Sequence, residues 1–269
     1  MGAYIDSIVT DAELRSDIKE LIPDVGLRRR MSRVVKSGVA TAMECLRGVR
    51  KEVTLDAIIT ATGYGCLTDS ERFLRNVIND REELLNPTPF IQSTFNTVGG
   101  QIALMRHDHC CNMTYANGAH SFEDALLDAM MQLSDGEAES VLLGAFDERT
   151  DAQERIMSRM GAFRDIPCGE GCVFMHITAS PVSGSMAEIA KLDFPTRTMS
   201  RDECRERYAS RPDAVVLYNE YHESGIYPTV AAGCFARAVA AIGNGRGEAV
   251  VYNEYWGNGP TVIVVRCIG

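Results

Sequence analysis

The residues of this chain best suited to covalent chemistry gather between His107 and His120. Cys110 and Cys111 offer thiols, and Tyr115 follows them at a predicted strand-to-helix turn. A thiol at a helix N-terminus is a good nucleophile because the helix dipole lowers its pKa, whereas a phenol, with a pKa of about 10, is a poor acyl carrier. Because Cys110 and Cys111 precede the turn, we expect them on the strand as buried structural thiols, without an activating dipole.

The same segment holds the residue types that are typical of a metal site. His107, His109, Cys110 and Cys111 combine imidazoles and thiols, which are good zinc ligands. Successive side chains of a strand point to opposite faces, however, and no second ligand pair with zinc-finger spacing follows. The spacing of Cys168 and Cys172 is a weaker signal still. The sequence therefore predicts no metal site and no cofactor.

Hydrophobic periodicity predicts the elements that precede this segment and follow it. Apolar residues at helical spacing predict a helix over Leu27–Leu46, with a run of arginines at its start, where the helix dipole does not favour cations. We expect those arginines to form a solvated face with ion pairs to nearby acids. Leu55–Thr62 and Val141–Ala145 are short continuous apolar runs, which is typical of strands covered on both faces.

Two further helices frame the predicted turn and the end of the chain. Ala119–Leu133 has a single apolar face and ends at a glycine, Gly136. Val230–Ile242 is apolar on all sides, so we expect it to be buried between two sheets. Strands alternating with helices, together with one helix too apolar for any surface, predict an α/β fold of five layers, α/β/α/β/α.

Two near-identical phrases occur late in the chain. Val216–Tyr221 and Val250–Tyr255 both end in Tyr-Asn-Glu-Tyr, and each is predicted to close a strand. We expect them to be paired strand ends that face one cleft. Ser180–Ser185, with a proline, a glycine and small polar residues, is the predicted crossover between the two halves.

Cys111–His120 resembles the nucleophile elbow of the β-ketoacyl synthases, which reads roughly Thr-Ala-Cys-x-x-Gly-x-His. Aligned without gaps on Gly118 and His120, the chain has Tyr115 where those enzymes carry cysteine. Six other segments also resemble the family. They correspond, in this order, to its arginine-rich first helix, a core strand, a proline-led segment that runs to the dimer interface, two further strands and the closing glycine-rich loop: Arg28–Glu44, Leu55–Gly63, Pro87–Leu104, Ser140–Glu148, Gly169–Met175 and Tyr252–Thr261.

The departures from the family pattern fall on its catalytic positions. Tyr227 stands where the family has the second of its two catalytic histidines, and His222 is the candidate for the first. Trp256 and Gly257 lie in the closing loop, which supplies a backbone donor for the oxyanion in those enzymes. The resemblance therefore identifies no catalytic residue in this chain. It places Tyr115, Tyr227, Trp256 and Gly257 along the space that an acyl chain would enter.

The resemblance also implies the architecture of the whole chain. The fold should be thiolase-like, with five layers and a shortened C-terminal half. We expect one domain over residues 1–269, pseudo-duplicated into a ketosynthase-like half, 1–178, and a reduced half, 179–269.

Charge and hydropathy exclude several classes of partner. The net charge of −10 disfavours nucleic acid and anionic membrane surfaces. The chain has no apolar run long enough to span a membrane and no signal-peptide pattern at Met1, and its nine cysteines do not form complete pairs. We therefore expect a cytoplasmic protein with reduced thiols.

Two functional hypotheses follow. The first is a non-catalytic subunit similar to a chain length factor, which pairs with an active β-ketoacyl-[acyl-carrier-protein] synthase in fatty acid, aryl polyene or polyketide biosynthesis and meets the acyl carrier protein indirectly. The alternative is a divergent but active 3-oxoacyl-[acyl-carrier-protein] synthase or acyltransferase that uses His222 or a cysteine. A third possibility is a homodimeric scaffold with no acyl ligand. All three imply pairing, as a heterodimer or a homodimer, through the strand over His109–Thr114.

Overall fold

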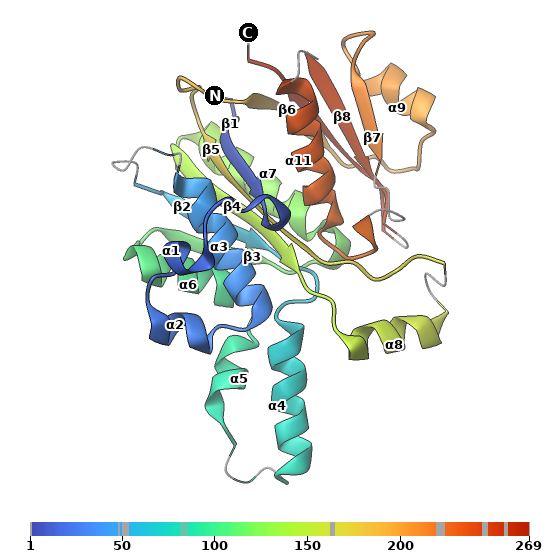
Figure 1. The fold of residues 1–269 in the computed structure, drawn as a ribbon. Coiled ribbons are helices and arrows are strands. Elements are labelled where there is room, and N and C mark those ends of the chain that lie inside the picture. The colour runs from blue at the N-terminus through green and yellow to red at the C-terminus, as the bar shows by residue number, and fades with distance from the viewer. Residues whose placement is uncertain are drawn as a thin grey trace.

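The computed structural model describes residues 2–47, 49, 54–81, 83, 85–161, 165–218, 224–243, 247–255 and 258–268, and these residues form a continuous nine-stranded sheet with helices on its faces (Figure 1). The strands are β1 Tyr4–Thr10, β2 Ala57–Ala61, β3 Cys111–Tyr115, β4 Ser140–Asp147, β5 Gly171–Thr178, β6 Ala187–Asp193, β7 Val215–Tyr218, β8 Glu248–Asn253 and β9 Thr261–Arg266. The helices are α1 Ile18–Leu21, α2 Val25–Arg30, α3 Arg33–Arg47, α4 Leu67–Asn79, α5 Pro87–Gln92, α6 Thr97–Arg106, α7 Ser121–Asp135, α8 Asp151–Met160, α9 Arg201–Tyr208 and α11 Val230–Gly243, with short 3-10 turns η1 Asp11–Glu13 and η2 Gly118–His120.

The sheet has two halves joined by a narrow seam. Its strand order is β3-β2-β4-β5-β1-β6-β9-β8-β7. β1 and β6 pair only through Tyr4 with Glu188 and Ile5 with Ala187, whereas β4 and β5 pair along eight positions from Ser140 to Asp147. The seam therefore divides the sheet into strands β1 to β5, which end at Thr178, and strands β6 to β9, which begin at Ala187.

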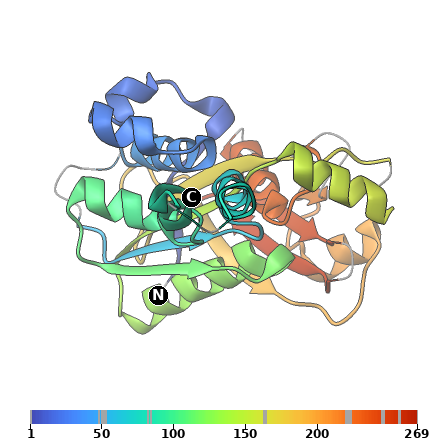
Figure 2. The ribbon, with the colours of Figure 1, turned by 90° about the horizontal axis from the view of Figure 1, so that it is seen from below.

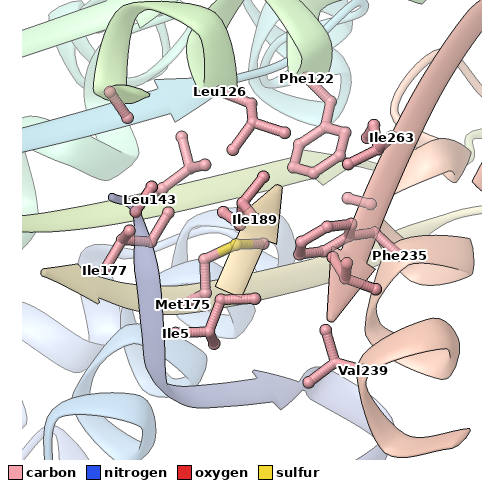
Figure 3. Close-up of a cluster of buried hydrophobic side chains, with 14 of the residues drawn as sticks. Ile5, Phe122, Leu126, Leu143, Met175, Ile177, Ile189, Phe235, Val239 and Ile263 are labelled. Atoms are coloured by element: carbon pink, nitrogen blue, oxygen red, sulfur yellow. The ribbon is translucent and has the colours of Figure 1, made fainter. Parts of the chain in front are cut away.

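Strand alternation directs one face of each half toward a shared core (Figure 3). Leu143 and Met175 from the first half and Ile263 from the second belong to one cluster of fully buried side chains. Phe122 of α7 and Phe235 of α11 lie in the same cluster, with their ring centroids 5.8 Å apart. The middle layer of the molecule thus consists of α7 and α11, between the two half-sheets.

The alternate residues of the same strands face outward and are covered by other helices. In the first half Leu142 and Phe174 pack with Val39 of α3. In the second half Val250 packs with Cys204 of α9. The order of layers is therefore α/β/α/β/α, as predicted, and α11 is the central helix that the sequence indicated.

The two near-identical phrases are neighbours in the sheet. β7 and β8 are parallel, with Val216 opposite Val250 and Tyr218 opposite Tyr252. The predicted pairing of the two phrases is confirmed, and their corresponding residues lie opposite each other. The continuation of the first phrase, residues 219–221, lies outside the described residues, so the predicted cleft between the strand ends stays a prediction.

The predicted helix over Leu27–Leu46 is divided in the structure, which corrects that prediction. α2 ends at Arg30, and Met31 has extended backbone with a buried side chain, so α3 starts afresh at Arg33. The arginines of residues 28–30 therefore lie in the last turn of α2, where the dipole favours cations. Arg33 forms an ion pair with Glu170, with both N···O distances at 2.5 Å, as expected of an arginine near acids.

Two helices extend away from the layered body. α4 and α5 lie side by side below the sheet in Figure 1, and Figure 2 shows α4 end-on. Phe73 and Phe90 hold them together, with ring centroids 5.1 Å apart. In the described part of the chain no helix is long and apolar enough to cross a membrane.

Candidate functional site

The predicted elbow is present between β3 and α7. Tyr115 is the last residue of β3, Gly118 has a φ of +56°, and the 3-10 turn from Gly118 leads into α7. The hydroxyl of Ser121 closes the turn: it accepts from the backbone N–H of Asn117 at 2.8 Å and lies 2.7 Å from the carbonyl oxygen of Gly118. The backbone N–H of Thr62 donates to the Tyr115 carbonyl at 3.0 Å, which fixes the elbow against the end of β2.

The side chain at the nucleophile position is not activated. Tyr115 is half-buried against the central core. Burial, followed by the charge of Asp128 and a hydrogen bond to that carboxylate, raises the pKa of Tyr115. A nucleophile needs a lowered pKa or an adjacent base free to take its proton. The phenol therefore stays protonated.

Asp147, at the end of β4, is the fully buried anchor of this region. One carboxylate oxygen accepts from the Thr62 hydroxyl and from the backbone N–H groups of Gly63 and Tyr64, at 2.8 to 3.0 Å. The other accepts from the N–H and the hydroxyl of Thr229 at 3.0 and 2.8 Å. Burial raises the pKa of Asp147, and these hydrogen bonds oppose that shift. The residue ties the loop after β2 to the start of α11.

The segment that leads into α11 packs against the loop after β2, and that loop lies beside the elbow. A Cβ atom at Gly63 would lie 2.2 Å from the Cβ of Pro228 and 3.1 Å from the carbonyl oxygen of Gly118. Only a glycine at position 63 allows the β2 loop, the elbow and Pro228 to approach this closely. The loop after β2 is therefore held between the elbow and the segment that leads into α11.

Tyr227 fills the neighbouring space between β5 and α11. Its side chain is 6% exposed. A Cβ at Gly171 would lie 2.5 Å from the Tyr227 hydroxyl oxygen, and one at Gly169 would lie 2.7 Å from the Tyr227 ring. Burial raises the pKa of Tyr227, so this phenol is not a proton acceptor at neutral pH. The other predicted site residues, His222, Trp256 and Gly257, lie outside the described residues.

His120 and Glu123 attach the elbow helix to the second half-sheet. His120 Nε2 lies 2.8 Å from the Gly259 carbonyl oxygen. One oxygen of Glu123 accepts from the Asn253 amide and the Thr261 hydroxyl, both at 2.7 Å, and its other oxygen is buried with no hydrogen-bond partner. Burial raises the pKa of Glu123. Sequence reasoning missed Glu123, although an acid on the apolar face of a predicted helix was a visible signal.

The thiols show no sign of activation. Burial raises the pKa of Cys45 to about 12 and raises the pKa of Cys110 and Cys168 as well. In the single chain Cys110 is half-buried and Cys111 is exposed, so their expected burial near a dimer interface stays a prediction. Both lie at the edge strand of the sheet, whose outer side has no neighbouring strand in the described chain.

A second polar arrangement lies at the opposite end of the strands. The imidazole of His176 is buried, with Nε2 2.8 Å from the Ser140 hydroxyl and Nδ1 3.2 Å from an Asp6 carboxylate oxygen. The contacts from Ser140 to His176 to Asp6 resemble a catalytic triad of nucleophile, base and acid. The backbone N–H groups of Glu139 and Ser140 both donate to the Asp56 carboxylate, however, at 2.8 and 3.0 Å. The Asp56 carboxylate thus occupies the backbone N–H groups that would otherwise stabilise an oxyanion beside Ser140. The arrangement therefore has a structural role.

Two pockets of about 650 and 640 Å³ open on other parts of the surface. The first lies between β1, α3 and α11, with Arg15, Glu44 and Arg47 at its rim. The second lies at the start of β4, beside Ser140 and Thr178. Neither is lined by Tyr115 or Tyr227. Among the described residues, no group of three or more His, Cys, Asp or Glu side chains is arranged to hold a metal ion.

Comparison with known proteins identifies the family. Residues 15–181, more than half of the chain, match the model of the β-ketoacyl synthase N-terminal domain. The chain belongs to the β-ketoacyl synthase family. No curated protein matches it by sequence.

Solved structures of this family share the fold of the whole chain. A structure of the ishigamide ketosynthase/chain length factor is similar with a TM-score of 0.76 and 17% identity over 100% of both chains. The ketosynthase ApeO in complex with its chain length factor ApeC, from Xenorhabdus doucetiae, gives a TM-score of 0.61 and 14% identity over 99% of both chains. FabH of Pseudomonas aeruginosa, a 3-oxoacyl-(acyl carrier protein) synthase III, gives 0.59 and 13% identity over 100% of this chain and 99% of its own. The thiolase-like ketosynthase fold predicted from the sequence is therefore correct.

Proposed function

We propose that the chain is a non-catalytic ketosynthase-like subunit that pairs with an active β-ketoacyl-[acyl-carrier-protein] synthase, in the manner of a chain length factor. The observation that carries the proposal is Tyr115, a phenol whose pKa is raised by burial and by the charge of Asp128, at the elbow position where the resemblance places the family's thiol. Claisen condensation requires a nucleophile that can hold the growing acyl chain as a thioester. A phenol with a raised pKa does not meet this requirement.

The packing around the elbow supports the same proposal. Tyr227 is buried at the position of a catalytic histidine, and its pKa is raised. Pro228 lies against Gly63, which in turn lies close to the Gly118 carbonyl oxygen of the elbow. We infer that Tyr115 and Tyr227 close the acyl site instead of serving it.

The exposed edge of the first half-sheet supports the proposal of a partner subunit. Met113 on β3 is 45% exposed, and Leu127 and Met131 on the adjacent face of α7 are 39% and 53% exposed. An edge strand beside apolar side chains is a surface that another chain can cover. Two of the similar structures are described as a ketosynthase with a chain length factor, and a third as a ketosynthase with its acyl-carrier protein. We propose a synthase of fatty acid, aryl polyene or polyketide biosynthesis as the partner, in the cytoplasm, with indirect contact to the carrier protein.

Acylation in solution tests the proposal. The chain is incubated with an excess of an isotopically labelled acyl thioester, and its intact mass and cysteine peptides are measured, with an active Cys-His-His ketosynthase as the positive control. We expect no stoichiometric label on the chain. Stable label on one specific cysteine would contradict the proposal and favour the alternative, a divergent active synthase or acyltransferase.

A further inference from the structure

A cavity of about 650 Å³ opens beside β1, away from the elbow. β1 pairs with β6 only as far as Ile5, so beyond that residue this edge of the strand has no partner strand in the described chain. Ser7, Ile8 and Val9 line the cavity, and α3 and α11 both contact β1. Alternate backbone N–H and C=O groups of an unpaired strand edge point outward and are available to a ligand. The volume lies in the range of small-molecule sites.

Two of the four charged side chains that line this cavity are held by the chain itself. The carboxylate of Glu13 accepts from the Thr10 hydroxyl at 2.9 Å, within the capping box of η1. The guanidinium of Arg47 donates to the Ser16 hydroxyl and lies 3.3 Å from a carboxylate oxygen of Glu20. Glu13 and Arg47 are therefore engaged before any ligand enters.

The other two, Arg15 and Glu44, supply a positive and a negative charge that the chain leaves unmatched. Among the described residues Arg15 forms no ion pair and donates no hydrogen bond. The side chain of Glu44 is 12% exposed, and its Oε2 is buried with no hydrogen-bond partner. Arg47 Nη1 lies 4.0 Å from that oxygen, beyond hydrogen-bond distance. A buried carboxylate oxygen without a donor costs free energy, which an N–H group of a ligand would recover.

This pair of charges decides which class of ligand fits. A simple anion would pair with Arg15 and leave Glu44 unmatched, and a simple cation would do the reverse. An ammonium group has three hydrogen-bond donors for a carboxylate, and a carboxylate suits the planar guanidinium. The lining also includes the apolar side chains of Met186, Ala236 and Ala240. A ligand that satisfies the whole lining therefore carries both charges and an apolar body.

We propose that this cavity binds a small zwitterion with an aliphatic body, of the size of an α-amino acid or a dipeptide. Its ammonium group contacts Glu44, its carboxylate contacts Arg15, and its aliphatic part lies against Met186 and α11. Because β1 and α3 precede the seam and Met186 and α11 follow it, the ligand bridges the two halves of the molecule. Neither Tyr115 nor Tyr227 lines the cavity, so the proposal is independent of the function proposed above.

Calorimetric titration of the full chain tests the proposal with matched ligands. L-leucine and L-leucyl-L-leucine carry both charges at two separations, isocaproate carries only the carboxylate, and isoamylamine carries only the ammonium group. We expect at least one zwitterion to bind with a Kd of about 1 mM or tighter, and each single-charge analogue to bind at least about tenfold more weakly. The absence of heat from both zwitterions at about 10 mM would overturn the proposal. Equal binding of a single-charge analogue would overturn it as well.

Variants of the two charges locate the ligand. E44Q keeps the shape of the side chain and removes its charge, and R15A removes the guanidinium. Each should weaken binding of the zwitterion at least about tenfold, because each leaves one ligand charge unpaired. E206Q on α9 and R159A on α8 change exposed residues of the same types elsewhere and should bind as the native chain does. Binding by E44Q and R15A that matches these controls would contradict the assignment.

A steric variant separates the cavity from any other binding surface. Ala240 is an exposed residue of α11 at the cavity wall, so A240F should fold and fill the space that the aliphatic body needs. Circular dichroism checks that each variant is folded. We expect A240F to abolish binding of the zwitterion, and retained binding would place the ligand elsewhere and overturn the proposal. Acyl labelling reports on the elbow and calorimetry on the cavity, so the two proposals can fail separately.

Discussion

Tyr115 illustrates how a single side chain can change the chemistry of a site while the backbone turn around it is kept. The backbone of the elbow is intact: Gly118 has a positive φ, Ser121 closes the turn and Thr62 is hydrogen-bonded to Tyr115. The side chain at the nucleophile position differs in kind, and its pKa is raised by burial and by the charge of Asp128. The fold of the elbow therefore does not depend on the thiol.

Asp147 is the residue on which the packing around the elbow depends most. Asp147→Ala leaves five donors without their acceptor, and we expect it to lower the free energy of unfolding by about 4 kcal/mol. Asp147→Asn, which keeps one accepting oxygen, should cost about half as much. Urea denaturation followed by circular dichroism measures both. Asp202→Asn on the exposed face of α9 is the control, and an equal effect of the control and Asp147→Ala would contradict the assignment.

Glu123 should make stability depend on pH with a sign opposite to that of an ordinary acid. Burial raises its pKa in the folded state above the usual 4.5. The folded chain then holds a proton that the unfolded chain releases, so the stabilisation is complete below pH 4.5 and is lost as the pH rises through the folded pKa. Glu123→Gln cannot ionise. We expect the native chain to lose stability relative to this variant as the pH rises from 4.5 to 8, measured by urea midpoints. A constant difference over that range would show that Glu123 does not titrate there.

At the scale of elements, the regular segments were predictable and their interruptions were not. α7 and α11 could be read from the 3.6-residue period, and β2 and β4 from their continuous apolar runs. The break at Met31 was missed because Met31 fits the helical stripe as a buried residue. The burial of Met31 in the cluster with Val34 and Val35 of α3 is a tertiary effect that periodicity does not contain.

The close approach of the β2 loop to α11 gives a prediction at this scale. Gly63→Ala places a methyl group within 2.2 Å of the rigid ring of Pro228, so the loop and the helix start must separate. We expect a loss of about 2–3 kcal/mol in the free energy of unfolding. Gly100→Ala is the matched control: a Cβ there meets nothing within 4 Å, and alanine favours the helix by about 0.5–1 kcal/mol. Two variants of equal stability would contradict the proposed contact.

The candidate site was predictable in part. Gly118 and His120 anchored the elbow, and the positions of Tyr115 and Tyr227 followed from the resemblance. Asp147 and Glu123 act through contacts with β8, β9 and the start of α11, segments about a hundred residues away in the chain. A single sequence does not show such contacts, because nothing in local spacing pairs an acid with a distant hydroxyl or amide.

At the scale of the whole molecule, the two half-sheets should unfold together. They share one core cluster, in which α11 contacts strands on both sides of the seam between β1 and β6. Phe235→Ala removes a fully buried ring from that cluster and should cost about 4 kcal/mol. Buried Cys172 and Cys204 report on the first and second half, and pulsed alkylation with mass spectrometry follows each thiol as urea is increased. Because the shared core couples the halves, both thiols should become reactive at one urea concentration, and Phe235→Ala should lower that concentration equally for both. Separate midpoints would mean that the seam, and not the helical layer between the half-sheets, governs the stability of the molecule.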